Sequence, residues 1–381
     1  MAARPCAGAA WDGPCGPGPE GPEVRAARGV EVGLLVDLDH LLREATAAGA
    51  SDIHLAVESA PILRVNGVLQ RVGQDVLGVA DAEAALRHLA APGQLERFGH
   101  HGEADFSYSL RGVGRFRVSA FRQRGSVSLA IRPIPSRVPD LRELGAPDGV
   151  ASLARREAGL VLVAGRAGSG KTMTIAAMVD LINTERALHV ITLEDPVEFL
   201  HRHRKALINQ REIGVDSLTF PQALRAAVRQ NPDVVVVGDV QEAETASLVL
   251  TAAGTGHLVI ANIRQPDCAS ALEYLVTLFP GEQQAQISWQ LAAVLEGAVA
   301  QLLLGRKDGQ GRVAAFEVLM ATPAVRTLIR EGKRQQITTL LRAGVRHGMR
   351  SMDQSWRELV ERGLLDDSEL PPFAVGGPGL A

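Results

Sequence analysis

Residues 165–172 read GRAGSGKT and fit the spacing G-x-x-x-x-G-K-[S/T] of a phosphate-binding loop. In such a loop, glycines let backbone N–H groups converge on phosphate oxygens, and the following helix adds partial positive charge. The lysine can reach the outer phosphates, and the final hydroxyl can ligate magnesium. We therefore predict a nucleotide site with Mg²⁺ held through Thr172. The predicted nucleotide-contacting residues of this segment are Gly165, Ala167, Gly168, Ser169, Gly170, Lys171, Thr172 and Met173.

The segments on either side of the loop decide between this prediction and its alternative. The alternative is a glycine-rich structural turn that contains a lysine by chance. The apolar run GLVLVA (159–164) indicates a buried strand, and TIAAMVDLIN (174–183) has apolar residues at helical spacing. The order strand, glycine-rich turn, helix favours the phosphate-binding loop.

Acidic residues follow two other apolar runs of the same region. HVITL (189–193) leads into a stretch that ends at Glu198, and DVVVV (233–237) is followed by Asp239. Parallel sheets place functional residues at the carboxyl ends of their strands. An acid there, beside a phosphate-binding loop, can hold magnesium or orient water. We predict catalytic roles for Glu198 and Asp239, with Asp239 also serving the metal, although each alone would be an ordinary solvated acid.

Arginines cluster in an earlier part of the chain, at Arg115, Arg117, Arg124 and Arg132. Strand alternation places Arg115 and Arg117 on the face opposite Phe116. A solvated strand face explains this pattern equally well. The functional hypothesis is that Arg117, Arg124 or Arg132 reaches the γ-phosphate of a nucleotide in a neighbouring subunit, because guanidinium pairs well with phosphate.

The elements that must position these residues fall into two groups. Before residue 135, alternating strands and two helices indicate a small α+β domain. After residue 150, short continuous apolar runs separated by helical segments indicate an α/β core with a parallel sheet. Beyond about residue 285 we expect helices and a hairpin. The predicted segments are helices at 34–49 and 79–91, strands at 104–110, 115–121, 126–134, 159–164, 189–193, 233–237 and 257–261, and a hairpin at 305–320.

Composition excludes several classes of function. The 381 residues carry a net charge of −3 and only 4% aromatic residues, so neither a basic footprint nor stacking platforms for nucleic acid are expected. The three cysteines are scattered and form neither a disulfide framework nor a zinc pattern. No apolar run is long enough to span a membrane.

Residues 33–365 resemble the pilus retraction ATPases, the PilT branch of the type II/IV secretion ATPases. The resemblance rests on several stretches distributed along the chain. They are GASDIHL (49–55), GVGRFRVSAF (112–121), GLVLVAGRAGSGKT (159–172), ITLEDPVEF (191–199), LINQREIG (207–214), LTAAGTGHLV (250–259), AVRTLIRE (324–331) and GMRSMD (348–353).

The resemblance implies a fold of two domains. These are an N-terminal PAS-like α+β domain at 33–135 and, after a linker at 136–150, a RecA-like P-loop NTPase domain at 151–365 with a helical C-terminal part. Residues 1–30 are predicted to be disordered and 366–381 to be a loose tail.

The resemblance also implies an activity and a setting. The chain is expected to be an ATPase that uses ATP and Mg²⁺, with Glu198 activating water and His257 as the first histidine of the family's His box. It is expected to form a homo-hexamer in the cytoplasm, at the inner face of the cell membrane. Its expected partners are an inner-membrane platform protein and a paralogous pilus ATPase. Nucleic acid is not an expected partner, and the membrane would be reached only through partner proteins.

Three positions depart from the family pattern. The stretch that usually reads G-E-[IM]-R-D has Asp239 in place of its glutamate and Gln241 in place of its arginine. The second histidine of the His box is Arg264. Binding residues are therefore kept while catalytic surroundings are altered.

Four hypotheses for the function follow. The first is an active retraction motor, and the second is a catalytically weakened ring component that partners a competent motor. The third, a motor for pilus assembly or secretion, is disfavoured by AVRTLIRE and by the lack of a four-cysteine cluster. A nucleic-acid translocase is the fourth, and the neutral charge argues against it.

Overall fold

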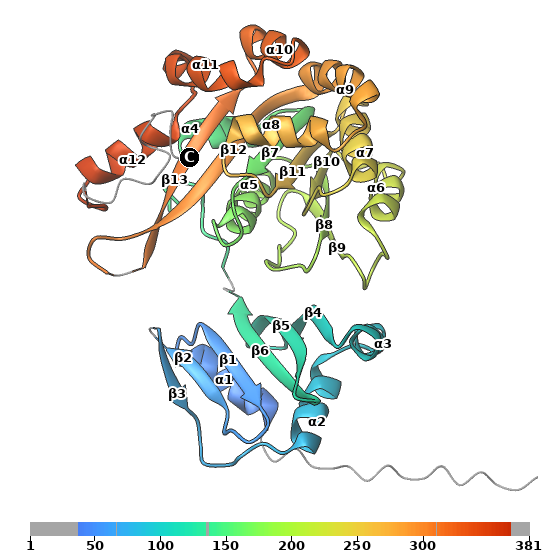
Figure 1. Ribbon diagram of the computed structural model, residues 1–381, viewed down its shortest axis with the longest axis vertical. Coiled ribbons are helices and arrows are strands. Elements are labelled where there is room, and N and C mark those ends of the chain that lie inside the picture. Colours follow the sequence, from blue (N-terminus) through green and yellow to red (C-terminus); the bar gives the residue numbers. More distant parts are fainter. Residues whose placement is uncertain (1–36, 66, 135–136, 310, 367–381) are drawn as a thin grey trace, which may run out of the picture. The chain divides into compact units, whose positions relative to one another are not determined.

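The structure is a computed structural model that describes residues 37–65, 67–134, 137–309 and 311–366. The predicted disordered segment 1–30 lies outside these residues, as does all but the first residue of the predicted tail. The described chain has a mixed α/β fold with two sheets (Figure 1), and each sheet has a hydrophobic core of its own.

The first sheet is antiparallel and has the strand order β3-β2-β1-β6-β5-β4. Its buried side chains form one core with those of the helices α1, α2 and α3. The elements are α1 (Leu38–Ala47), β1 (Asp52–Ala56), β2 (Ile62–Val65), β3 (Val68–Arg71), α2 (Val79–Leu89), α3 (Pro92–His101), β4 (Glu103–Leu110), β5 (Gly114–Gln123) and β6 (Ser126–Ile134).

Strand β5 shows the alternation that the sequence predicts. Phe116 and Val118 are buried in the core, while Arg115 and Arg117 lie on the other face. Helix α3 was not predicted, because its ten residues PGQLERFGHH contain two glycines and few apolar side chains. It begins with proline at its first turn and ends at Gly102, which adopts the left-handed conformation.

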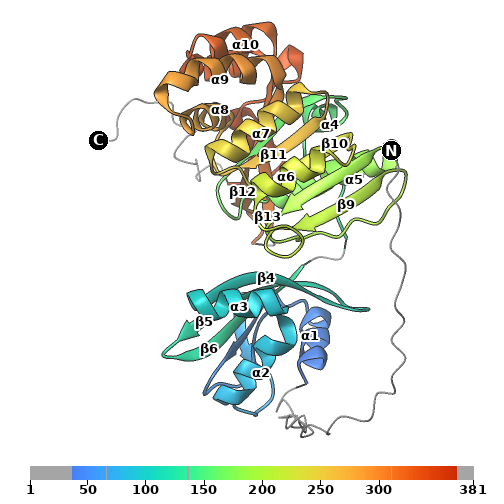
Figure 2. The same ribbon diagram turned by 90° about the vertical axis from the view of Figure 1, so that its right-hand side faces the viewer.

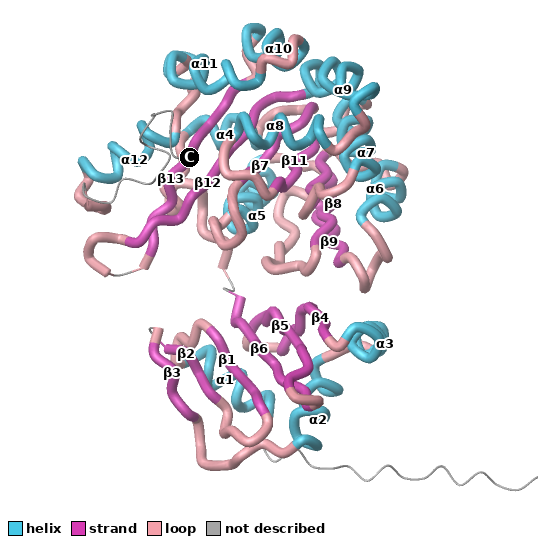
Figure 3. Tube along the Cα trace, in the orientation of Figure 1, coloured by secondary structure: helices cyan, strands magenta, loops and turns pink. Residues whose placement is uncertain are grey.

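The second sheet has seven strands in the order β13-β12-β7-β11-β10-β8-β9. All neighbours are parallel except β12 and β13, which form an antiparallel hairpin (Figure 3). The elements are α4 (Asp148–Ala154), β7 (Gly159–Ala164), α5 (Lys171–Glu185), β8 (His189–Glu194), β9 (Leu207–Glu212), α6 (Phe220–Val228), β10 (Val234–Val237), α7 (Ala243–Gly254), β11 (Leu258–Ile263), α8 (Cys268–Thr277), α9 (Gly281–Val294), β12 (Leu295–Gly305), β13 (Arg312–Met320), α10 (Pro323–Arg330), η1 (Arg334–Gln336), α11 (Ile337–Ala343), η2 (Val345–His347) and α12 (Met352–Glu361).

Helices cover both faces of this sheet, as the continuous apolar runs predict. In β7, Leu160 and Leu162 face one core with the helices α6 to α9, some of which are seen in front of the strands in Figure 2. Val161 and Val163 face the opposite core with α4 and α5. The strands β7, β10 and β11 are buried along nearly all of their length. Functional side chains must therefore come mainly from the polar loops at the ends of these strands.

The structure corrects the predicted C-terminal pattern. The hairpin occupies 295–320, and its first strand, β12, directly follows α9 in a region predicted to be helical. Periodicity does not separate a short apolar run of this kind from a buried helix. Helix α4 begins at Asp148, within the predicted linker 136–150. None of the helices in the described ranges has both the length and the apolar character needed to cross a bilayer.

Candidate active site

The register of the parallel strands brings four loops to one edge of the second sheet. Ala164, the last residue of β7, is paired with Ile263, the last residue of β11. Val237, the last residue of β10, is paired with Ala261 of β11 on one side and with Leu193 of β8 on the other. The segments that follow these four strands therefore leave the sheet side by side, at its carboxyl edge.

The phosphate-binding loop follows β7 and ends where α5 begins, at Lys171. Gly170 has a φ of +90°, and a Cβ there would lie 2.8 Å from Nε2 of Gln301. Gln301 lies on β12, and its Oε1 accepts a hydrogen bond of 2.5 Å from Thr174 Oγ1 of α5. The sequence analysis missed Gln301, whose signal is a single polar residue within the apolar run of β12. The Gln301 side chain packs against the phosphate-binding loop and thereby restricts the conformation of the loop.

Lys171 is buried and points back into its own loop. Its Nζ donates hydrogen bonds to the carbonyl oxygens of Gly165 and Arg166, at 2.7 and 2.8 Å. Of the other predicted loop residues, Ser169 is buried, Ala167 and Gly168 are exposed, and Thr172 and Met173 are half-buried. The backbone and the lysine are thus arranged as the loop prediction requires.

The charges around Lys171 show which predicted residues converge. Burial lowers the pKa of the Lys171 ammonium, and the nearby positive charge of Arg264 lowers it further. The carboxylates of Asp239 and Glu198 act in the opposite direction. Lysine, both predicted acids and the arginine therefore share one electrostatic environment.

Asp239, two residues beyond β10, is a buried acid of this edge, with a side chain 9% exposed. Its Oδ2 forms an ion pair with Arg264, whose Nη2 lies 2.6 Å away, and it accepts a hydrogen bond of 2.6 Å from Gln241 Nε2. Its Oδ1 is buried and has no hydrogen-bond partner. Asn262 donates to the carbonyl oxygen of Gly238 at 2.7 Å and so holds the backbone just before the acid.

The residues of this edge fit a nucleotide-bound magnesium ion. Asp239 Oδ1 is an unpaired carboxylate oxygen, the type of ligand that Mg²⁺ prefers. Thr172 is the second residue of α5. The described residues contain no cluster of three or more His, Cys, Asp or Glu side chains able to hold a metal.

Glu198 and the residue before it are held by the two predicted strand arginines of β5. Arg117 Nη1 lies 3.2 Å from Glu198 Oε1. Arg115 Nε donates to the carbonyl oxygen of Val197 at 2.7 Å, and its Nη2 lies 2.7 Å from Glu212 Oε2. Glu212 accepts in turn from the Val197 N–H at 3.1 Å. Both polar groups of the Val197 residue are therefore fixed by the Arg115–Glu212 pair.

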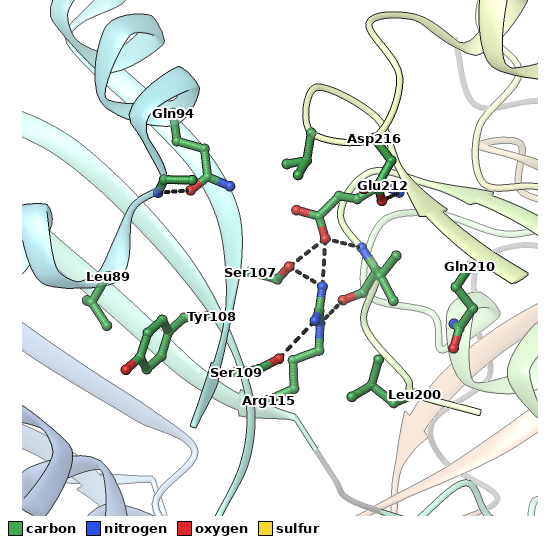
Figure 4. A pocket seen from close by; sticks show the side chains of 13 residues that line it. Leu89, Gln94, Ser107, Tyr108, Ser109, Arg115, Leu200, Gln210, Glu212 and Asp216 are labelled. Carbon is green, nitrogen blue, oxygen red and sulfur yellow. Dashed lines mark hydrogen bonds and ion pairs between the residues drawn. The ribbon is translucent and has the colours of Figure 1, made fainter. Parts of the chain in front are cut away.

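Figure 4 shows this pair in a cavity of about 350 Å³. The serines of β4, Ser107 and Ser109, both hydrogen bond with Arg115. Glu212 was missed by the sequence analysis, and Arg115 was not selected. In the sequence, these two residues are only opposite charges on two regular strands. They can be recognised as a pair only when the positions of the two strands are known.

The other two predicted arginines lie elsewhere. Arg124 is exposed at the turn between β5 and β6, with a φ of +49°. Arg132 is paired with Asp52 of β1, with Nη2 2.8 Å from Oδ1. Within the described chain, only Arg117 of the three selected arginines contacts a predicted catalytic acid.

His257 is not brought into the cluster. It directly precedes β11, at the amino end of that strand, and its Nδ1 contacts the carbonyl oxygen of Ala252 at 3.0 Å. The six residues of β11 separate it from Arg264, which at about 3.3 Å per residue amounts to roughly 20 Å. A catalytic role for His257 on a nucleotide bound by its own chain is therefore not supported by this geometry.

Comparison with known proteins shows which family the chain belongs to. The family described as Type II/IV secretion system protein matches residues 31–370. The chain belongs to this family. It is 39% identical over 330 residues to the type IV pilus retraction ATPase PilT of Pseudomonas aeruginosa. This match covers 87% of this chain and 96% of PilT. It is 40% identical over 305 residues to a twitching motility protein of Neisseria gonorrhoeae, covering 80% of this chain and 82% of that protein.

A solved structure gives the same result. The chain is similar to the crystal structure of the pilus retraction motor PilT with bound ADP, with a TM-score of 0.82 and 38% identity. The match covers 90% of this chain and 98% of that one. The chain is thus an ATPase of this family.

Proposed function

We propose that this protein is an ATP-driven motor that retracts type IV pili. One observation carries the proposal. The phosphate-binding loop, Asp239 and Glu198 share one electrostatic environment in a chain that matches PilT over nearly the whole of PilT. Binding residues alone would support a nucleotide-binding protein. The two additional acids supply what hydrolysis requires.

The roles of the residues follow from their positions. The loop N–H groups bind phosphate oxygens, and Lys171 exchanges its two loop carbonyls for a phosphate. Thr172 and Asp239 would hold Mg²⁺ and its water, and the bound ion would supply positive charge that neutralises the phosphate oxygens. Glu198 accepts the proton of the attacking water. Arg117 orients Glu198 through their ion pair.

The finer description of the fold and assembly is also a proposal. We assign the first sheet to a PAS-like domain and the second to a RecA-like domain. The chain acts as a homo-hexamer at the inner face of the cell membrane, with an inner-membrane platform protein and a paralogous pilus ATPase as partners. Hydrolysis can produce movement only within such an assembly, because an isolated subunit has no second component that it could move.

Phosphate release by the purified protein, compared with Lys171→Ala, tests the enzymatic part. Complementation of twitching in a cell that lacks its own retraction motor tests the biological part. We expect the parent to restore twitching and release phosphate, and Lys171→Ala to do neither. A parent that releases phosphate but does not restore twitching with its own platform protein present contradicts the retraction proposal.

The weakened ring component is the alternative. It is suggested by the fact that two of the three departures from the family pattern, Gln241 and Arg264, contact the third, Asp239. Under this alternative the protein binds ATP, releases almost no phosphate alone, and accelerates a paralogous motor when mixed with it. The similarity to PilT favours the motor.

A further inference from the structure

The Asp239 carboxylate has one paired and one unpaired oxygen, and the two donors on the paired oxygen differ in character. Gln241 belongs to the same loop and is two residues away. Arg264 comes from the end of the neighbouring strand, β11, and brings a full positive charge. In the ion pair between Arg264 and Asp239, the arginine is therefore the partner that another positively charged group can replace.

The two partners of the ion pair differ in burial. The Arg264 side chain is 62% exposed, whereas the Asp239 side chain is 9% exposed. Moving the arginine costs little desolvation, because its side chain is already largely exposed. Leaving the acid without a cation is expensive, because an uncompensated buried charge is strongly unfavourable. Arg264 can thus leave only when another cation serves Asp239.

Arg264 also lies within electrostatic reach of the group that binds the outer phosphates. Its charge acts on the Lys171 ammonium in opposition to Asp239 and Glu198. A lysine of this loop type contacts the β- and γ-phosphates. A guanidinium near that ammonium is placed to pair with the terminal phosphate, and the fork of donors on arginine matches phosphate oxygens.

We propose that Arg264 senses the terminal phosphate by exchanging partners. It pairs with Asp239 until Mg²⁺ and ATP bind, and then moves to the terminal phosphate while the metal and its water take over Asp239. ADP lacks that phosphate, so with ADP the arginine stays on the acid. This inference rests on the proposed binding of ATP at residues 165–172 and assigns Arg264 as a specificity-determining residue for ATP over ADP.

The test is a comparison of ATP and ADP affinity in Arg264→Gln. With Mg²⁺ present, a fluorescent non-hydrolysable ATP analogue and a fluorescent ADP are titrated into parent and variant. We expect the variant to bind the ATP analogue about tenfold more weakly, the loss of one charged hydrogen bond. Its ADP affinity is expected to stay within about twofold of the parent, because ADP makes no contact with this side chain.

Two further variants keep the test decisive. Arg264→Lys retains the charge without the fork and should recover part of the ATP preference. Arg229→Gln removes an exposed arginine at the end of α6 and should leave both affinities unchanged. ADP binding by Arg264→Gln shows that the site is still folded.

The outcomes separate this inference from the proposed function. Equal losses of ATP and ADP affinity in Arg264→Gln, or no loss of either, show a fixed ion pair and overturn the exchange. If the parent binds neither nucleotide, the proposed function fails as well. Preferential loss of the ATP analogue supports both.

Discussion

The two sides of the nucleotide site are built differently. The phosphate-binding loop is one contiguous segment between β7 and α5, and its groups are mainly backbone N–H groups and one lysine. The acidic side takes Asp239, Arg264 and Glu198 from the ends of three different strands. The loop keeps the family pattern around its lysine, whereas the acidic side carries Asp239, Gln241 and Arg264 in place of the expected residues.

This difference indicates which residues of such a site can be substituted. A loop whose backbone binds phosphate depends on its own shape, so one change there alters many contacts. Side chains from separate strands can change together, provided that charge is balanced. The direct contacts of both Gln241 and Arg264 with Asp239 agree with such joint change. Changes in the loop should therefore act mainly on nucleotide binding, whereas a change of the catalytic acid Glu198 should act mainly on turnover.

The largest expected effect comes from Glu198→Gln. Loss of a general base lowers turnover by about 100-fold or more, and the isosteric amide should leave ATP affinity nearly unchanged. Phosphate release and nucleotide titration measure the two quantities. Glu273→Gln, at an exposed position of α8, is the matched control. Turnover equal to the parent would remove Glu198 from the mechanism.

Lys171→Ala should act mainly on binding. A charged hydrogen bond contributes roughly 1.5–3 kcal/mol, which corresponds to a loss of affinity of about tenfold to 100-fold. Titration with a fluorescent nucleotide measures it, and Lys333→Ala at an exposed position serves as the control. ATP affinity equal to that of the parent contradicts the assignment of the loop.

Arg117→Ala sharpens the comparison, because it changes the support of Glu198 without changing the acid. Its ion pair is partly exposed, so we expect turnover to fall by about tenfold and ATP affinity to change little. Arg124→Ala, on the exposed turn, should have no effect in the isolated chain. If Arg124→Ala lowers turnover as much as Arg117→Ala does, then the turn reaches a site in a neighbouring subunit.

The smallest effect concerns Glu194 and appears in stability. Burial raises the pKa of this carboxyl above its ordinary value of 4.5, and the nearby charge of Glu198 raises it further. The folded protein therefore retains a proton that the unfolded chain releases. Its contribution to the free energy of unfolding is complete below pH 4.5 and is lost as the pH rises through the raised value.

Glu194→Gln removes this contribution. Urea unfolding of parent and variant at about pH 5 and about pH 8 should show a steeper decline for the parent. Equal slopes would show that Glu194 keeps an ordinary pKa in the folded protein.

The sequence determined the loop and the strand and helix on either side of it. The glycines and Lys171 act within eight consecutive residues, so their geometry is local and follows from residue type. The rule that parallel strands carry functional groups at their carboxyl ends also placed Asp239 and Glu198 correctly at one edge. The same rule does not place His257 at that edge, because His257 precedes its strand instead of following it.

Only the tertiary structure decided which side chains contact one another. Arg264 and Asp239 lie 25 positions apart and meet because β10 and β11 are neighbours. Gln301 reaches the loop because β12 pairs with β7 across a long separation in the chain. Glu212 and Arg115 likewise come together only once their strands are placed. Periodicity reports which face of an element is buried, whereas strand order and register fix the partners that each exposed or buried polar group meets.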